Sequence, residues 1–457
     1  MDYICINTYN PMFSIHKCLF LILTVITSCI YCNAAVTFTG NTRPVITERP
    51  PASTGLDDLY VLYETNRVSV QYTSSGSSPV KWYRFSSLGG GYAEEVPSSQ
   101  EGQISTLSYL QGNMGYIVED GSYRYYFWVV SYSYYRLYLS SLTISPDSDC
   151  ASTVLIPSSN GEKIVYYSIN GAPQTLSRDI ELSYNTLVWD AEMSLFRQKE
   201  NVVSYPYISS PIHAPAPLCN TEFTLTGDRF LQIWGEEVSV TSNIYESIAV
   251  SAETSAVQTV REYDNEKNDG NGSALGGSAP CEIEFSATTT DAAIYREWQF
   301  STDPDFVNLT DRYNDADVTY TFRNQGTTYV RFMASNAYGL CDWYSETYQI
   351  NIGESALECP NAFSPGSTEG INDEWKVSYK SIISFECQIF NRWGQKIAEL
   401  TDPSQGWDGR YHGKLVPAGV YYYVIRAKGS DGKEYKLNGD INIINFKDNR
   451  RTTSQSR

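Results

Sequence analysis

The chain has 457 residues, too many for one hydrophobic core, and this length predicts three to five domains. Tyrosine is abundant at 37 residues, Lys and Arg together number only 33, and no long amphipathic helical pattern occurs, which favours an all-β fold. The net charge is -19; residues 1–35 and 359–444 are balanced and 445–457 carry +3, so residues 36–358 carry -22. This acidity argues against nucleic acid or an anionic membrane as a partner.

Residues 1–35 have the pattern of a signal peptide. The apolar run from Cys18 to Cys32 is too short for a comfortable membrane span, and Ala34-Ala35 offers small residues for cleavage. We therefore expect export and no transmembrane span in the mature chain. Two alternatives stay open: Met12 as the true start, and Cys29 as a site of lipid attachment.

Residues 36–260 predict two β-sandwich modules. The first, 36–145, is expected to be immunoglobulin-like, with strands at 60–63, 68–72 and 80–85 and a closing pair at 123–130 and 136–144. The second, 146–260, has its clearest strands at 163–167, 186–189 and 223–225. Residues 261–279 are rich in Gly, Asn and Asp and predict a flexible linker.

A third module is expected at 280–353. Cys281 precedes a short strand, Trp298-Gln299-Phe300 follows, and the strand 329–334 leads into the sequence Ser-Asn-Ala-Tyr-Gly-Leu-Cys, which ends at Cys341. This text resembles the PKD-like sandwich repeats of bacterial surface proteins, although Leu340 interrupts the usual Tyr-Gly-Cys ending. The resemblance implies a spacer or adhesive unit.

Residues 357–446 predict a small β-sandwich. Alternating side chains at 385–390 indicate a strand, and the sequence Asn-Arg-Trp-Gly at 391–394 ends it. A type I turn at 417–419 leads into the β-branched and aromatic strand 420–427, and Asp431-Gly432 suits a tight hairpin into 433–444. Nothing in this segment looks catalytic.

The same segment resembles the gliding-motility-associated C-terminal domain, the type B sorting domain of the type IX secretion system of Bacteroidota-type bacteria. The sequence keeps PNAFSP, GIND, FNRWGQK, GWDG, VPAGVYYYVI and GDINII in the family's order. The residues that carry these motifs are Asn361, Phe363, Pro365, Asn372, Asp373, Phe390, Asn391, Arg392, Trp393, Gly394, Trp407, Asp408, Gly409, Pro417, Gly419 and Tyr421.

The resemblance implies export by the type IX machinery, bound through this domain, to the outer face of the outer membrane or beyond. Residues 366–370 depart from the family's usual acidic loop and lose two oxygen ligands, so no calcium site is carried over. Residues 447–457 form a basic tail.

Six cysteines remain after the leader: Cys150, Cys219, Cys281, Cys341, Cys359 and Cys387. Six cysteines allow fifteen pairings, but consecutive pairs fall within consecutive expected modules. We therefore predict the bridges Cys150–Cys219, Cys281–Cys341 and Cys359–Cys387, each stabilising its module by about 2–4 kcal/mol.

Catalytic and metal-binding patterns are weak. The part after the leader has only His213 and His412, and no HExxH, GxSxG, Walker A or GxGxxG motif occurs. Residues 264–270 match a calcium loop poorly, and the acids Asp303, Asp305, Asp311, Asp315 and Asp317 are equally explained as exposed turn residues. We expect no enzyme, cofactor or metal, although paired carboxylates of a secreted glycan hydrolase stay an alternative.

Tyrosine and other aromatic residues crowd the strand around 123–130. Residues two apart share a face, so Phe127 is expected to fill the core and Tyr126 and Trp128 to lie on the outer face. Two alternatives stay open for that outer face: partial cover by neighbouring strands, which is the favoured one, and a candidate binding strip formed by Tyr126 and Trp128. The sequence as a whole predicts tandem β-sandwich modules ending in a sorting domain. The expected function is a non-catalytic surface adhesin or structural protein with a glycan or protein ligand; the alternatives are the hydrolase and a subunit of a surface assembly.

Overall fold

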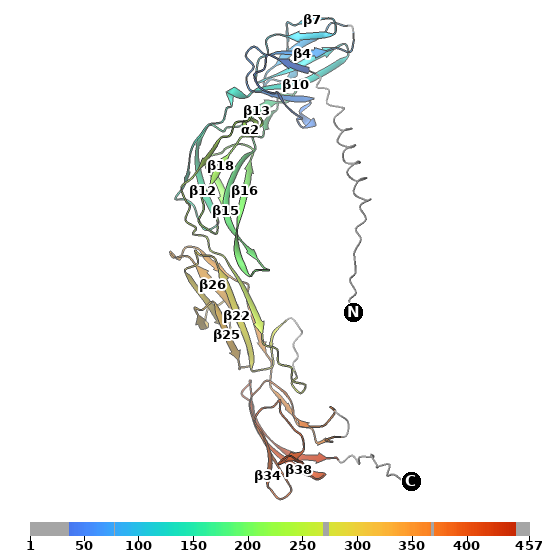
Figure 1. Cartoon of the computed structure of the whole chain (residues 1–457), viewed down its shortest axis with the longest axis vertical. Helices are drawn as coiled ribbons and strands as arrows, with labels where there is room; N and C mark the ends of the chain where they lie inside the picture. Colours follow the sequence, from blue (N-terminus) through green and yellow to red (C-terminus); the bar gives the residue numbers. More distant parts are fainter. Residues whose placement is uncertain (1–35, 77, 268–273, 367–369, 445–457) are drawn as a thin grey trace, which may run out of the picture.

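A computed structural model describes residues 36–76, 78–267, 274–366 and 370–444, so the predicted signal peptide and the predicted basic tail lie outside the described residues. The fold is all-β, as predicted, with four β-sandwiches arranged end to end (Figure 1). We call them the first module (β1–β10), the second module (β11–β19), the third module (β20–β28) and the C-terminal domain (β29–β39). No helix within the described ranges has the length and apolarity needed to cross a membrane.

The first module is an immunoglobulin-like sandwich of two sheets. One sheet has the order β1 (Val36–Thr39), β4 (Ser69–Thr73), β8 (Ile104–Leu107), β7 (Ser99–Glu101). The other has the order β2 (Ile46–Glu48), β3 (Asp58–Leu62), β10 (Tyr123–Ser131), β9 (Met114–Asp120), β5 (Lys81–Phe85), β6 (Glu94–Val96), and the short 3-10 helices are η2 (Ala52–Thr54), η3 (Gly90–Tyr92) and η4 (Tyr132–Tyr134). Trp82 is fully buried between the sheets and donates its indole N–H to the Ser105 hydroxyl at 2.9 Å.

The second module has two main sheets and a hairpin. The sheets run β11 (Leu139–Ile144), β12 (Ser152–Ser159), β17 (Ile212–Pro215) and β16 (Leu195–Tyr205), β15 (Ile180–Asp190), β18 (Thr224–Thr226), β19 (Ser239–Thr241). The hairpin pairs β13 (Ile164–Tyr167) with β14 (Pro173–Leu176). The one α-helix among the described residues is α2 (Arg229–Ile233), which the Asp228 side chain caps. The predicted closing pair of the first module is wrong, because β10 pairs with β9 and β3 whereas β11 pairs with β12.

The third module also begins earlier than expected. Its sheets run β20 (Ala252–Gln258), β22 (Cys281–Thr289), β25 (Asp317–Phe322) and β21 (Leu275–Gly277), β28 (Tyr348–Ile352), β26 (Gly326–Ser335), β23 (Tyr295–Ser301), β24 (Leu309–Tyr313), with β27 (Asp342–Tyr344) paired to β26. Residues 252–258, assigned to the second module from the sequence, thus pair with the third. Trp298, Phe285 and Phe332 fill its core.

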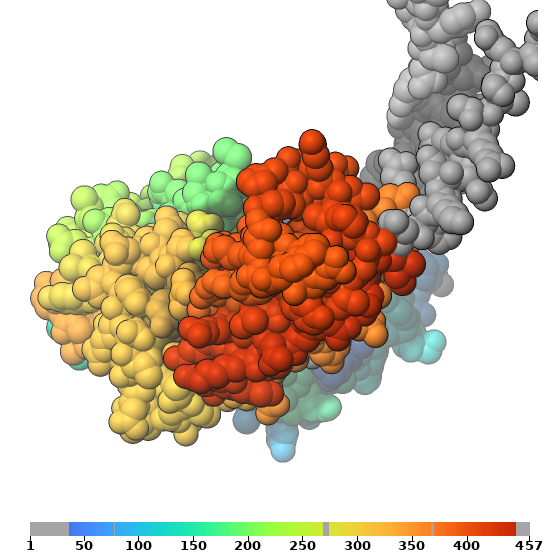
Figure 2. Space-filling model, turned by 90° about the horizontal axis from the view of Figure 1, so that it is seen from below, coloured from blue at the N-terminus to red at the C-terminus, as the bar shows by residue number. Residues whose placement is uncertain are grey.

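The C-terminal domain is built on a five-stranded sheet. Its order is β30 (Ala362–Phe363), β39 (Glu434–Ile443), β38 (Gly419–Gly429), β33 (Ile382–Phe390), β34 (Lys396–Leu400). Short pairs cover it: β29 (Ala356–Glu358) with β32 (Ser378–Lys380), β31 (Trp375–Lys376) with β35 (Gly406–Trp407), and β36 (Arg410–Tyr411) with β37 (Lys414–Leu415). This domain occupies the end of the array opposite the first module, and Figure 2 shows its orange-to-red surface from that end.

The first and second modules share one continuous hydrophobic core. Val61, Trp128 and Val130 of the first module belong to the same buried cluster as Ile164 and Tyr166 of the second. Backbone hydrogen bonds join the loops around it, since the Ile169 N–H donates to the Thr54 oxygen at 2.9 Å and the Gly90 N–H donates to the Ile169 oxygen at 2.7 Å. A Cβ on Gly89 (φ +87) would lie 2.7 Å from that Ile169 oxygen, so glycine permits the close approach.

A disulfide links the second module to the third. The structure pairs Cys150 with Cys341, so the predicted bridges Cys150–Cys219 and Cys281–Cys341 are wrong. Cys219 and Cys281 are free thiols. The loop of residues 336–341 reaches back to the second module, where the Asn336 amide also donates to the Ile248 oxygen at 3.2 Å.

The predicted bridge Cys359–Cys387 is not formed either. Both residues are free thiols. Burial, and to a smaller extent the charge of Cys359, raises the pKa of Cys387 to about 12, which shows that the two sulfur atoms lie near each other. Burial alone places these thiols in one core without requiring a covalent bond.

Peptide mapping under non-reducing conditions tests the covalent assignment. We expect one cross-linked peptide pair that contains Cys150 and Cys341, and alkylation of the other cysteines after unfolding. Alkylation of Cys150 before reduction, or a peptide that joins Cys281 to Cys341, would show that the bridge between the modules does not form.

Residues 261–279 do not form the predicted flexible linker in their described part. β21 pairs with β28, and residues 264–267 extend onto the C-terminal domain as a short strap. The Asn265 amide donates to the Val377 and Pro403 oxygens, each at 2.8 Å, and the Lys267 N–H donates to the Tyr379 oxygen at 2.7 Å. The third module therefore holds the C-terminal domain by backbone pairing as well as by chain continuity.

Candidate functional site

The predicted binding strip is not an exposed surface. Phe127 points into the first module's core, as predicted, and Tyr125 and Val129 lie in the same cluster. Trp128 is only 1% exposed, however, and packs against Phe85 and against Tyr167 of the second module, with ring centroids 5.8 and 5.6 Å away. Tyr126 is half-buried at the same junction. The second module covers the face that the sequence assigned to a ligand.

The motif residues of the C-terminal domain divide into those that hold its fold and those that do not. Phe363, Trp407 and Tyr421 form a ring series in the core, with centroid distances of 5.5 Å and 5.3 Å. The Tyr421 hydroxyl donates to the Pro417 oxygen at 2.8 Å, and the Trp407 indole N–H donates to the Arg410 oxygen at 3.1 Å. These aromatic residues have a structural role.

The turn after β33 is fixed by its own first residue. The Asn391 side-chain oxygen accepts the N–H groups of Trp393 and Gln395 at 3.0 and 3.1 Å, so the asparagine takes the place of a backbone turn. Gly394 has φ +79, which glycine adopts without strain. Asn391 and Gly394 thus shape the turn that presents the two residues between them.

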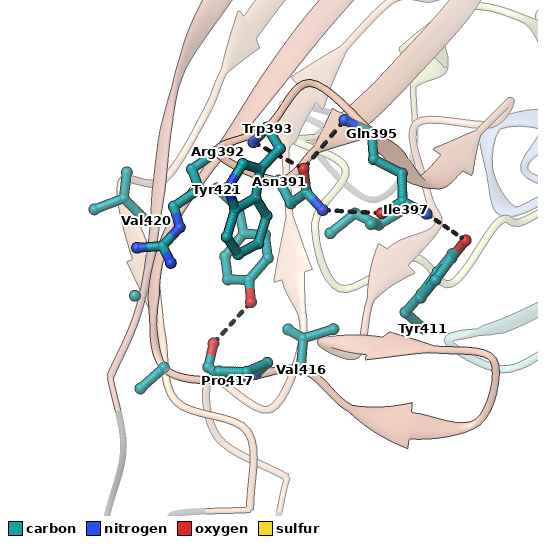
Figure 3. Close-up of a pocket in the computed structure, with 12 residues that line it drawn as sticks. Asn391, Arg392, Trp393, Gln395, Ile397, Tyr411, Val416, Pro417, Val420 and Tyr421 are labelled. Atoms are coloured by element: carbon teal, nitrogen blue, oxygen red, sulfur yellow. Dashed lines mark hydrogen bonds between the residues drawn. The ribbon is translucent and has the colours of Figure 1, made fainter.

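Arg392 and Trp393 are those two residues. Trp393 is 75% exposed, and the Arg392 guanidinium lies over its ring, 4.2 Å from the centroid. Both side chains line a cavity of 330 Å³ together with the loop that contains Pro417 and the start of β38 (Figure 3). Burial raises the pKa of the Tyr421 hydroxyl, whereas the positive charge of Arg392 opposes that rise. Tyr421 lines the same cavity, so the guanidinium contributes a positive potential at the cavity wall.

The remaining motif residues support loops or strand ends. Asp373 accepts the N–H groups of Gly366 and Gly370 at 2.8 and 2.7 Å, and the Asn361 oxygen accepts the Asn442 N–H at 2.9 Å. Three of the others shape loops: Asn372 and Gly409 have positive φ values of +55 and +73, and Asp408 accepts the Arg410 N–H. Pro365 lies beside Gly409, Phe390 ends β33, and Gly419 begins β38. Most of the motif is therefore explained by folding, and the exposed Arg392–Trp393 pair is not.

No Asp or Glu is among the described residues that line this cavity. Within the ranges that the structure describes, no group of three or more His, Cys, Asp or Glu residues is placed to hold a metal ion. Asp264 and Glu266, from the weak calcium-loop match, form ion pairs with Lys376 and Arg261 instead. The site can bind a partner through an aromatic ring, a guanidinium and a shallow apolar wall.

Comparison with protein families locates two known domains. Residues 357–443 match the CHU_C Type IX secretion signal domain, and residues 143–242 match a fibronectin type III domain. The molecule is thus a multidomain β-sandwich protein sorted by the type IX secretion system. Its C-terminal domain is a type IX secretion signal domain, as the sequence resemblance implied, and this implies secretion and surface exposure.

Whole-chain similarities are weak. The chain is similar to a tetra-tandem repeat in the extending region of a large adhesion protein, at 11% identity over 88% of this chain and 99% of that one. It is also similar to the FN1–FN3 domains of chicken CNTN1, at 12% identity over 67% and 98%. Both TM-scores are 0.21, too low to carry an argument about arrangement or function. No curated protein matches the sequence.

Proposed function

We propose that this protein is a non-catalytic surface adhesin, exported by the type IX route and presenting its first module away from the outer membrane. The observation that carries the proposal is the braced, end-to-end array with the secretion signal domain at one end (Figure 1). A shared core, a disulfide and a backbone-paired strap occupy its three successive junctions. Rigid junctions suit a spacer that must hold a binding module at a distance.

We further propose that Arg392 and Trp393 form the contact with the export machinery. Exposed tryptophan and arginine are the residues most enriched among those that dominate binding energy at protein interfaces. The Asn391 turn fixes this pair beside the cavity before any partner arrives, which lowers the conformational entropy lost on binding.

Replacing Trp393 by alanine is the test. We expect the amount of protein at the cell surface, measured by protease accessibility on intact cells, to fall by about 30-fold, as for the loss of a 2 kcal/mol anchor. Attachment of the cells should fall with it. The melting temperature of the purified variant should match that of the wild type, because the ring is exposed.

Tyr109→Ala is the matched control for surface display, since Tyr109 is 91% exposed on the first module, at the other end of the array from the secretion signal domain. Normal surface display of Trp393→Ala would remove the assigned role of the pair. Normal display of a chain that lacks residues 359–457 would remove the sorting function itself. The adhesin role would be contradicted if the wild-type protein is fully displayed and a strain that lacks it attaches as well as the wild-type strain does.

A further inference from the structure

The 330 Å³ cavity of the C-terminal domain carries a single charge. Arg392 is the one charged residue among those that line it, and the others are neutral, such as Val416 and Val420. The Arg392 guanidinium lies over the Trp393 ring, 4.2 Å from its centroid, on the side of the cavity where Val420 lies (Figure 3). A positive charge is therefore held in one position beside an apolar wall.

The charges on the surrounding strands are matched, but that of Arg392 is not. Three basic side chains of β34, β38 and β39 have acidic neighbours: Lys396 has Glu399 at 2.8 Å, Lys436 has Glu434 at 3.0 Å, and Arg426 has Glu386 opposite it in register. Among the described residues, no ion pair or hydrogen bond includes the Arg392 guanidinium. Asp440 accepts from the Asn442 amide at 2.8 Å and lies two strand spacings, about 10 Å, from β33. The N–H donors of Arg392 are thus available to an anion from outside the chain.

The outer face of the sheet continues the apolar wall of the cavity. β38 is the central strand of five, and its residues Val420, Tyr422 and Val424 point away from the core. Each is between 43% and 46% exposed, and Phe390 of β33 lies opposite Tyr422. Val420 belongs both to this row and to the cavity lining, so the two form one surface. A stable protein interface needs about 800 Å² from each partner, more than a cavity alone supplies.

We infer that the component of the export machinery that contacts Arg392 and Trp393 presents an acidic residue to the guanidinium, surrounded by an apolar protein surface. A guanidinium binds a carboxylate through paired hydrogen bonds. An apolar side chain of the partner fills the cavity, and its neighbours cover the row Val420, Tyr422 and Val424. A lipid phosphate satisfies Arg392 but leaves that row uncovered, so the row favours a protein. The inference rests on the proposed contact with the export machinery and adds the chemistry of the partner.

Charge changes at Arg392 test the inference through surface display of the full chain, measured by protease accessibility on intact cells. We expect Arg392→Gln to reduce display about tenfold, as for the loss of a charge-assisted hydrogen bond. Arg392→Glu should reduce it about tenfold more, because it repels the partner's carboxylate. Arg392→Lys keeps the charge and should be displayed better than Arg392→Gln. Val420→Glu, which offers the guanidinium a carboxylate of its own chain, should reduce display more than Val420→Lys.

The apolar row is tested by a change that keeps the preference for a strand. Val424→Thr should reduce display about fourfold, the effect of losing one apolar methyl group from a buried contact. Val202→Thr is the matched control, since Val202 is a strand residue of the second module and is 51% exposed. All these variants should melt as the wild type does, because the altered side chains are exposed.

Equal display of Arg392→Gln and Arg392→Glu, with a loss for Trp393→Ala, would overturn the acidic partner and leave the proposed contact standing. Normal display of Trp393→Ala would remove the contact itself. Unchanged display of Val424→Thr would overturn the role of the apolar row. A lipid source is tested by sedimentation of residues 36–457 with vesicles, which we expect to be no greater for phosphatidylglycerol than for phosphatidylcholine. Sedimentation with phosphatidylglycerol that Arg392→Glu abolishes would replace the protein carboxylate with a lipid phosphate.

Discussion

Trp128→Ala is expected to destabilise the first two modules by about 3–5 kcal/mol, the usual cost of emptying a buried aromatic site. Trp128 is 1% exposed and contacts rings of both modules, Phe85 in the first and Tyr167 in the second. Its loss should therefore weaken protection against amide hydrogen exchange on both sides of the junction, in β10 and in β13. Denaturant unfolding of the full chain, followed by hydrogen exchange, measures both effects.

Phe127→Ala provides the comparison at the next residue. Phe127 is fully buried but contacts the first module's core, so a similar loss of stability should be confined to that module. Tyr134→Ala, at an 84% exposed ring, should change stability by no more than about 0.5 kcal/mol. A Trp128→Ala effect that leaves the second module's exchange unchanged would show that the two modules fold independently.

Sequence reasoning located the strand that contains Trp128 but did not predict that the second module covers it. Alternation assigns Phe127 and Trp128 to opposite faces, and the structure confirms that opposition. It does not reveal whether the second face meets solvent or a neighbouring module. The assumption that one face of each sheet is exposed to solvent therefore assigned Trp128, a residue buried at the junction, to a candidate ligand-binding surface.

The same limit explains the errors at the cysteines and the linker. Pairing consecutive cysteines assumes that a bridge closes within a module, whereas Cys341 lies on a loop that reaches the second module and Cys150. A polar, glycine-rich composition predicted a linker at 261–279, but composition does not show that the Asn265 amide meets two carbonyl oxygens of the next domain. Contacts between modules depend on their relative placement, which local sequence patterns do not encode.

The C-terminal domain was predictable for the opposite reason. Its turns and strands follow from local signals, such as the turn at 391–394 and the hairpin at Asp431-Gly432, and its motif identifies the family. The motif alone does not separate Trp407, which is 3% exposed, from Trp393, which is 75% exposed. Burial, and not residue type, distinguishes the ring that holds the fold from the exposed ring that we propose contacts a partner.

The second large effect is expected at a buried ion pair under the same junction. The Arg178 and Asp228 side chains are both fully buried, with Arg178 Nη2 2.9 Å from Asp228 Oδ2. The Tyr132 hydroxyl of η4 donates to Asp228 Oδ2 at 2.9 Å, and Arg178 Nη1 donates to the Glu162 oxygen at 2.9 Å. Burial and the neighbouring Asp228 charge raise the pKa of Tyr132, so its hydroxyl stays a donor.

Arg178→Ala should destabilise the joined first and second modules by about 3–5 kcal/mol, because it leaves the Asp228 carboxylate buried without a cation. Replacing both residues by apolar ones, as in Arg178→Met with Asp228→Leu, should cost less than the single change, since neither charge is then stranded. Thermal and denaturant unfolding of the full chain measure both. Removal of Arg197, whose pair with Asp190 is on the surface, should leave the transition nearly unchanged. A single variant as stable as the double one would show that the pair is not what holds this junction.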